Sequence, residues 1–200
     1  MTKSLNNISE DTVRGRLARY SFYHAIEVLA NVFTPGLERL QSLQLFVSQA
    51  LQSLSVGGRR VLDIGCRDSL FSFQAEELGA FEVIGIDNDL SKGAVEFLIP
   101  YKQSCVRCMD ELDGTAPPAH FGKFALVIFA GVLYHLRYPM WAIKLIRDVM
   151  NYDALMILET ALYTLHEDEA LLFCPIGSER PYEPTSVTVL NLEGLTGALA

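Results

Sequence analysis

The stretch VLDIGCRDSLFS, residues 61–72, has the pattern of a buried strand, a tight turn and the start of a helix. Its apolar run ends in Asp63 and a single glycine, Gly65. Strand–turn–helix units of this kind hold nucleotides in doubly wound sheets. Turns that bind dinucleotides carry three glycines, G-x-G-x-x-G, so that backbone amides can approach a pyrophosphate. With one glycine, the turn favours a nucleoside ligand that has no pyrophosphate.

Strand and helix patterns alternate along the chain on both sides of this turn. The apolar patterns predict strands at 59–66, 82–87, 104–110, 124–131 and 153–162, and helices at 69–79, 91–100 and 139–150, with Pro100 ending the second helix. Such alternation predicts an α/β fold with a doubly wound, mostly parallel sheet and right-handed crossovers. We expect a helical lid segment at residues 1–56, followed by one compact ligand-binding domain at 57–200.

Residues 9–55 have a mainly helical pattern. Within SFYHAIEVLANVF, residues 21–33, a helix would present one apolar stripe and one polar stripe. The polar stripe, which includes His24 and Glu27, is either a solvated face or the substrate-side wall of a lid. An extended conformation is the alternative for this segment.

Polar residues recur where the predicted strands end. Asp87, which lies 22 residues beyond Gly65, stands at the distance at which a carboxylate reaches a ribose hydroxyl. Asp110 suits an adenine amine, and groups around Gly65 suit an amino acid. Glu159 ends the fifth strand and either faces a second substrate or is solvated. The sequence therefore predicts S-adenosylmethionine as the nucleoside ligand.

Several motifs carry a family resemblance, namely FYHAIE (22–27), TPG (34–36), VLDIGCRDSLFSF, VIGID and FALVIFAGVLYHLRYP (124–139). With them, the chain resembles class I S-adenosylmethionine-dependent methyltransferases, nearest to the group related to tRNA wobble-uridine carboxymethyltransferases. The resemblance implies a Rossmann-like methyltransferase fold, S-adenosyl-L-homocysteine as the product, and Tyr134 at the reactive end of the cofactor. The residues expected to bind the cofactor are Asp63, Gly65, Cys66, Arg67, Asp87, Asn88, Asp110, Glu111, Ala130 and Gly131.

Two features depart from the pattern of that family. Arg67-Asp68-Ser69 replaces the usual Asn-Asp-Gly, whose residues tolerate left-handed backbone, although Asp68 or Ser69 could still cap the helix. The tryptophan- and lysine-rich stretch of the tRNA enzymes is absent ahead of the first strand. The tRNA substrate and the carboxylated cofactor therefore do not transfer from the resemblance.

Methyl transfer requires alignment, exclusion of water and, for a hydroxyl acceptor, a base. His135 is the expected base because the ordinary pKa of histidine, near 6.5, suits proton removal, and Tyr134 is the expected neighbouring catalytic residue. The main prediction is O-methylation of a small molecule. The alternatives are a tRNA wobble-uridine type of enzyme and a catalytically idle binding protein with a methyltransferase fold.

The composition bears on partners and location. The chain has 200 residues, a net charge of −8 and a pI of about 5, which disfavours nucleic acid as a partner. Without a secretory signal or a membrane span, we expect a cytoplasmic protein with reduced cysteines. Cys105 and Cys108 would point to opposite faces of a strand, so no metal site is expected.

The last segment, residues 186–200, offers one short strand and a helix start. The sheet is therefore expected to lack the final strands of its class. The apolar fifth strand is then an exposed edge, which SVTVL (186–190) could pair locally, a partner chain could cover, or a native chain that continues further could complete; we favour self-association through this edge, such as a homodimer.

Overall fold

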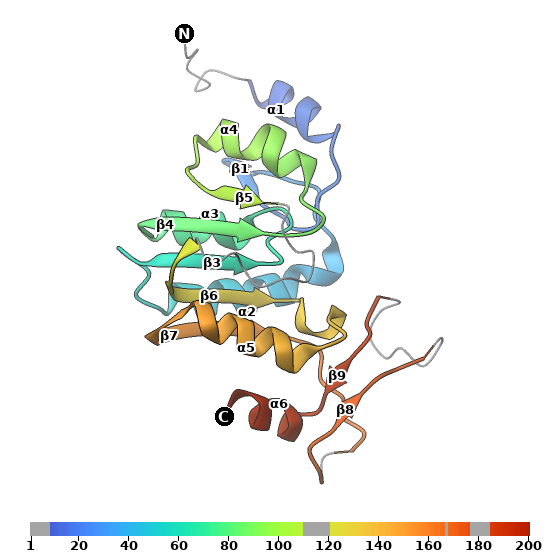
Figure 1. The fold of residues 1–200 in the computed structure, drawn as a ribbon. Coiled ribbons are helices and arrows are strands. Elements are labelled where there is room, and N and C mark those ends of the chain that lie inside the picture. The colour runs from blue at the N-terminus through green and yellow to red at the C-terminus, as the bar shows by residue number, and fades with distance from the viewer. Residues whose placement is uncertain (1–8, 110–120, 167, 177–184) are drawn as a thin grey trace. The chain divides into compact units, whose positions relative to one another are not determined.

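The computed structural model describes residues 9–109, 121–166, 168–176 and 185–200 (Figure 1). Its central sheet has five strands in the order β5-β4-β3-β6-β7, in which β3–β4, β4–β5 and β6–β7 pair in parallel. The predicted α/β, mostly parallel fold is confirmed. The chain divides into two compact parts, Met1–Leu112 and Asp113–Ala200, and each is described by itself.

The first part holds the predicted strand–turn–helix unit. Its elements are α1 (Glu10–Leu17), β1 (Glu27–Leu29), β2 (Val32–Phe33), η2 (Glu38–Leu40), α2 (Gln41–Gln52), β3 (Arg60–Ile64), α3 (Leu70–Glu77), β4 (Glu82–Ile86), η3 (Ala94–Leu98), α4 (Ile99–Lys102) and β5 (Arg107–Met109). Strand β4 pairs in parallel with both β3 and β5. The carboxyl ends of the three strands therefore lie at one edge, as Figure 1 shows. Residues 61–64 of β3 and 83–86 of β4 are all buried, which explains the unbroken apolar run in each strand.

The prediction of a helix over residues 21–33 is wrong. This segment is extended and forms the antiparallel hairpin β1–β2. Its backbone groups bond to side chains from elsewhere: Gln44 of α2 accepts from the N–H of Ala25 at 3.2 Å and donates to its carbonyl at 2.8 Å. Thr34 Oγ1 accepts from Ile26 N at 2.8 Å. These tertiary hydrogen bonds replace the ladder that a helix would have formed.

Pro100 does not end its helix as expected. The helix continues through Pro100 to Lys102 and ends at Gln103, whose φ is +54°. The preceding residues, Ala94–Leu98, form a π-helix. The wider turn changes the hydrogen-bond pattern just before the proline, and Pro100 stands in the first turn of α4, where the missing N–H costs little.

The second part contains β6 (Phe124–Ala130), η5 (Leu133–His135), α5 (Pro139–Val149), β7 (Met150–Glu159), β8 (Leu172–Phe173), β9 (Val189–Leu190) and α6 (Leu192–Leu199). Strands β6 and β7 are parallel, and β9 pairs with β8 in a separate sheet. One bridge, Leu162–Leu190, lies just beyond β7. Strand β7 is last in the order and exposes Tyr152 at 96%. Self-association through this edge stays a prediction.

Among the residues that the structure describes, every helix is too short or too polar to cross a membrane.

The turn between β3 and α3 adopts left-handed backbone three times, at Gly65 (φ +78°), Arg67 (φ +45°) and Ser69 (φ +64°). Only the first is glycine, and such backbone costs an L-residue roughly 1–2 kcal/mol. Neither expected cap is formed by a side chain: Ser69 Oγ lies against Cys108, while Asp68 bonds to the N-terminal segment. The turn is therefore held in a strained form by contacts from outside it.

We predict that Ser69→Gly raises the free energy of unfolding by up to about 1 kcal/mol, because relief of the left-handed strain, roughly 1–2 kcal/mol, outweighs the loss of the weak 3.0 Å contact of Ser69 Oγ with Cys108 Sγ. The matched control is Ser72→Gly, three residues later and inside α3. It should lower the free energy of unfolding by about 1–2 kcal/mol, since glycine loses more backbone entropy when the helix forms and the hydrogen bond to Asp63 is deleted. Urea unfolding of both variants measures this. A loss of stability at both positions would contradict the strain at Ser69.

Candidate functional site

The turn after β3 and the loop after β4 are joined by backbone hydrogen bonds around Asp87. The Asp87 carboxylate accepts from Arg67 N at 2.9 Å through Oδ2 and from Asp89 N at 2.7 Å through Oδ1. In return, Ser91 N donates to Arg67 O at 3.1 Å. Asp87 is 7% exposed. The carboxylate predicted to meet a ribose therefore also fixes the two loops that border it.

The Arg67 side chain lies across this loop rather than in open solvent. Its guanidinium donates to the Asp89 carboxylate and, at 2.8 Å, to the Asp89 carbonyl. Its Cζ stands 5.9 Å from the centre of the Tyr23 ring. Arg67 thus lies beside Asp87, where a ligand that bonds to Asp87 must share space with it.

Asp63, at the end of β3, is 2% exposed and accepts a 2.6 Å hydrogen bond from Ser72 Oγ of α3. Burial raises the pKa of this carboxyl to about 6, against which the Ser72 hydrogen bond acts. Asp63 therefore changes charge near neutral pH and favours a cation beside it.

Asp68 connects the turn to the N-terminal segment. Its fully buried carboxylate accepts from Tyr23 N at 2.5 Å and His24 N at 2.7 Å. Burial alone would raise the pKa of this carboxyl, but the His24 ring and the N–H groups of His24 and Tyr23 hold that pKa below its ordinary value. Asp68 Oδ1 has no hydrogen-bond partner in the described part of the chain, and His24 Nδ1, which lies 3.5 Å from Asp68 Oδ2, makes no hydrogen bond of normal geometry there. They have hydrogen-bonding capacity left for a ligand or water.

Cys66, also in this turn, is buried against β4. A side chain on Gly85 would place its Cβ 2.8 Å from Cys66 Sγ, so glycine is required there. Cys108 of β5 is paired in register with Gly85, and Ser69 Oγ lies 3.0 Å from its sulfur. The turn therefore contacts both β4 and β5.

In the second part, the chain after β6 turns at Gly131, whose φ is +74°. A Cβ on this glycine would lie 3.7 Å from Tyr134 Oη and 3.9 Å from Glu159 Oε2. Oε2 of Glu159 is buried without a partner among the described residues, and burial raises the pKa of this carboxyl. Gly131 thus lies beside a phenol and a carboxyl whose Oε2 atom has no hydrogen-bond partner among the described residues.

His135 follows Tyr134 in the short helix η5, and their ring centres are 4.3 Å apart. His135 Nδ1 lies 3.3 Å from the carbonyl oxygen of Thr185. Because a carbonyl only accepts, this contact selects the tautomer with a proton on Nδ1 and leaves a lone pair on Nε2. The predicted base therefore has a tautomer that can accept a proton.

The predicted site residues fall into two groups. The first part brings together Asp63, Gly65, Cys66, Arg67 and Asp87, with Asn88 exposed beside them. The second part brings together Ala130, Gly131, Tyr134 and His135. Asp110 and Glu111 lie outside the described residues.

Sequence reasoning missed the role of Asp68 in holding His24. The two residues are far apart in the chain, and no local spacing signals the contact. The FYHAIE and Arg67-Asp68-Ser69 motifs were both visible, but nothing in them predicted that they touch.

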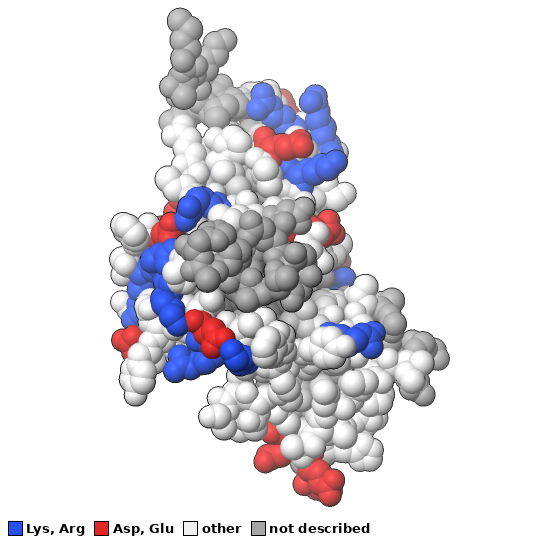
Figure 2. Space-filling view, viewed as in Figure 1, with Lys and Arg blue, Asp and Glu red and all other residues white. Residues whose placement is uncertain are grey.

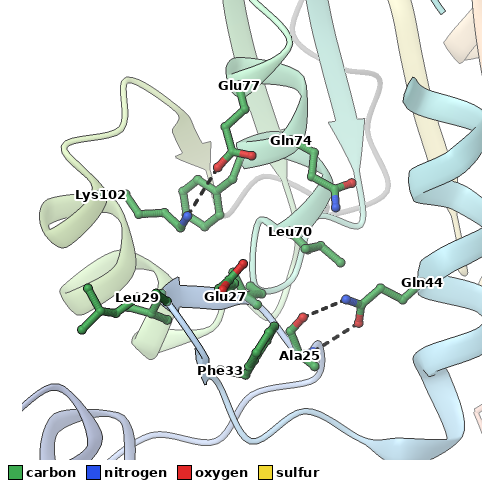
Figure 3. A pocket seen from close by; sticks show the side chains of 13 residues that line it. Ala25, Glu27, Leu29, Phe33, Gln44, Leu70, Gln74, Glu77 and Lys102 are labelled. Atoms are coloured by element: carbon green, nitrogen blue, oxygen red, sulfur yellow. Dashed lines mark hydrogen bonds and ion pairs between the residues drawn. The ribbon is translucent and has the colours of Figure 1, made fainter. Parts of the chain in front are cut away.

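A separate cavity of about 580 Å³ lies in the first part and contains none of the predicted site residues (Figure 3). Its walls come from the β1–β2 hairpin, α2, α3 and Lys102 of α4. Lys102 pairs with Glu77 at 3.5 Å, and Gln74 Oε1 is buried without a partner in the described ranges. Leu70, the residue that directly follows the turn, lines this cavity.

Charged side chains are mixed on the face that Figure 2 shows. Lys and Arg lie there in separate groups with Asp and Glu among them. In the first part, Arg60 and Arg107 both pair with Glu82. These cations are therefore partly neutralised by their neighbours.

Curated proteins with similar sequences have one recurrent name. A tRNA U34 carboxymethyltransferase of Campylobacter lari is 29% identical over 118 residues, which are 58% of this chain and 40% of that protein. The Campylobacter hominis protein of the same name is 31% identical over 122 residues, or 60% and 42% of the two chains. The chain spans about two fifths of the length of these relatives.

Solved structures with a similar fold include the N-terminal domain of EvdMO1, crystallised with SAH bound. It has a TM-score of 0.69 at 17% identity and covers 99% of this chain and 88% of that one. The YcgJ protein of Bacillus subtilis has a TM-score of 0.54 at 17% identity, covering 76% and 64%. At such identities the likeness concerns the fold alone.

A family model described as a methyltransferase domain matches residues 37–200, which include both groups of predicted site residues. The match covers most of the chain, from α2 to α6. The order of strands, the turn after β3 and this match agree, and the chain belongs to the methyltransferase domain family.

Proposed function

We propose that the protein is an S-adenosylmethionine-dependent methyltransferase that acts on a hydroxyl group of a small molecule. The observation that carries the proposal is the pairing of the one-glycine turn with Asp87. Arg67 N and Asp89 N each occupy one oxygen of this carboxylate. A carboxylate has about four acceptor positions, so two remain for the ribose hydroxyls.

The residues of the first part fit such a cofactor in charge as well. Asp63, Asp68 and Asp87 are 2%, 0% and 7% exposed, and burial of like charges at one sheet edge is costly without a cation. S-adenosylmethionine carries a sulfonium and an ammonium group. Asp87 would hold the ribose, while Asp63 and the turn at Gly65 would hold the amino acid end.

When bound, S-adenosylmethionine supplies an electrophilic methyl group on sulfur. The protein's residues then have to align the acceptor, exclude water and remove a proton. In our proposal His135 Nε2 takes the proton of the acceptor hydroxyl, and Thr185 O holds the ring through Nδ1. Tyr134 and Glu159 supply the polar groups beside Gly131 that orient the acceptor.

A second candidate is the modification of a tRNA wobble uridine. The names of the curated relatives favour it. A third is a binding protein without catalysis, favoured by the Arg67–Asp89 pair beside Asp87. Calorimetric titration with S-adenosylmethionine, its carboxylated analogue and NAD distinguishes the three. Our proposal expects binding of S-adenosylmethionine above the others; binding of the carboxylated analogue alone would favour the tRNA-type reading, and no binding would favour the idle protein.

We predict that Asp87→Ala weakens S-adenosylmethionine binding by about 1.5–3 kcal/mol, because two charge-assisted hydrogen bonds to the ribose are lost. Isothermal titration measures the dissociation constant. Asp87→Asn, which keeps one acceptor for the loop, guards against a loss of folding, and Asp153→Ala on β7 controls for the change in charge. An unchanged dissociation constant in folded Asp87→Ala would refute the ribose contact.

We predict that binding of S-adenosylmethionine weakens as the pH falls below 6. The Asp63 carboxyl, with its pKa raised to about 6, is then protonated and no longer attracts the ligand's ammonium group. At pH 5 about a tenth of Asp63 is ionised, so the affinity should be about tenfold lower than at pH 7.5. Asp63→Asn should show the same affinity at both pH values. A flat profile in the wild type would contradict the role of Asp63.

We predict that His135→Asn lowers the rate of methyl transfer by about 10²–10⁴-fold with little change in cofactor affinity, since the base is removed and the cofactor contacts remain. The control is His166→Asn, an exposed histidine of the second part. Turnover is followed as S-adenosylhomocysteine release with a panel of hydroxylated small molecules. Full activity of His135→Asn on an accepted substrate would reduce His135 to a packing role.

A further inference from the structure

Two of the four free thiols, those of Cys66 and Cys108, meet on the sheet of the first part. Gly85 of β4 makes the meeting possible. Cys66 Sγ fills the space where a side chain at Gly85 would be, at 2.8 Å from that Cβ position. Cys108 is the register partner of Gly85 on β5, and paired residues of parallel strands point to the same face. The sulfur of Cys66 therefore lies over Gly85 and beside Cys108.

The surroundings make the two thiols chemically different. The Cys66 thiol hydrogen-bonds to the Cys108 sulfur, and Ser69 Oγ lies 3.0 Å from the same sulfur. The hydrogen bond to Cys108 and burial raise the pKa of Cys66, while the hydrogen bonds from Cys66 and Ser69 lower the pKa of Cys108. Cys108 is partly exposed and Cys66 is buried. Cys108 thus has the properties of an attacking thiolate, and Cys66 those of a resolving thiol.

We propose that Cys66 and Cys108 form a redox modification site that reacts with low-molecular-weight disulfides such as glutathione disulfide and closes into an intramolecular disulfide. The pair lies outside the chemistry of methyl transfer, which uses neither sulfur as a reactant. A disulfide here would join the turn after β3 to β5 across β4.

The reaction balances in two exchanges. The Cys108 thiolate attacks one sulfur of the glutathione disulfide, breaks its S–S bond and releases one glutathione thiolate, which takes up a proton. Cys66 then loses its proton to solvent and attacks the Cys108 sulfur of the mixed disulfide, releasing a second glutathione. The protein dithiol is oxidised by two electrons, and glutathione disulfide is reduced to two thiols.

Closure also changes the turn. The two sulfurs must approach from hydrogen-bond distance to about 2.05 Å, so Cys66 has to move. The next residue, Arg67, donates its N–H to Asp87 at 2.9 Å. If the cofactor binds as proposed above, oxidation should lower its affinity by about 10-fold, the effect of losing about one hydrogen bond to the ligand. This consequence rests on the proposed function, whereas formation of the disulfide does not.

The test uses the full chain with Cys105→Ser and Cys174→Ser, which removes the two exposed thiols and leaves the proposed pair. The folded protein is incubated with glutathione disulfide, and the thiols are counted and the intact mass recorded. We expect both thiols to be lost, the mass to fall by that of two hydrogen atoms, and a peptide cross-link between Cys66 and Cys108. Dithiothreitol should restore both thiols.

Single replacements identify the order of reaction. In that background, Cys66→Ser should stop at a stable mixed disulfide on Cys108, while Cys108→Ser should leave the buried Cys66 unmodified. Cys66→Ala serves as the second variant if serine at this buried position unfolds the chain. The matched control is the chain with Cys66 and Cys108 replaced by serine and the exposed thiols kept, which should gain glutathione without a cross-link.

Two stable glutathione adducts, or two unmodified thiols in the folded protein, would overturn the proposal. Titration of the reduced protein with S-adenosylmethionine tests the proposed function separately. A cross-link with no cofactor binding in the reduced form would retain the dithiol site and reject the cofactor. Equal affinity in the reduced and oxidised forms would retain the disulfide and reject its effect on binding.

Discussion

The buried carboxylate of Asp68 is the constraint on which the rest of the first part depends. It follows a left-handed residue, Arg67, and precedes another, Ser69, so it points back from the turn toward the N-terminal segment. There it accepts the N–H groups of Tyr23 and His24. A buried carboxylate without donors would be costly, and these donors lower the pKa of Asp68. The same contact joins the turn to the extended segment at residues 21–33.

Hydrogen bonds of the Arg67 backbone then connect this turn to the loop after β4. Arg67 N meets Asp87, and Arg67 O accepts from Ser91 N. Both contacts use the main chain, so they tolerate arginine where asparagine is common in the family that the chain resembles. The side chain of Arg67 instead pairs with Asp89. The cost of the arginine is thus backbone strain and crowding beside Asp87, while the loop connection is kept.

Two glycines, one in β4 and one in the turn after β6, lie beside reactive side chains. Gly85 admits the sulfur of Cys66 beside Cys108, and Gly131 lies next to Tyr134 and Glu159. At Gly85 the missing Cβ allows the close approach, and hydrogen bonds lower the pKa of Cys108 there; beside Gly131, burial raises the pKa of Glu159. Glycines therefore help to position the reactive groups in this fold, as do the residues that bear those groups.

The sequence by itself determined the α/β class, the strands from β3 to β7, and the gathering of Asp63, Gly65 and Asp87 at one sheet edge. It could do so because strand periodicity and strand-end position are local properties of the chain. Only the tertiary structure decided three further points. Residues 21–33 are extended, Pro100 lies inside its helix, and Cys66 lies beside Cys108. The first and the last depend on hydrogen bonds or steric room supplied by residues far away in sequence, which no local pattern contains, and the second depends on the π-helix just before the proline, which the apolar pattern does not reveal.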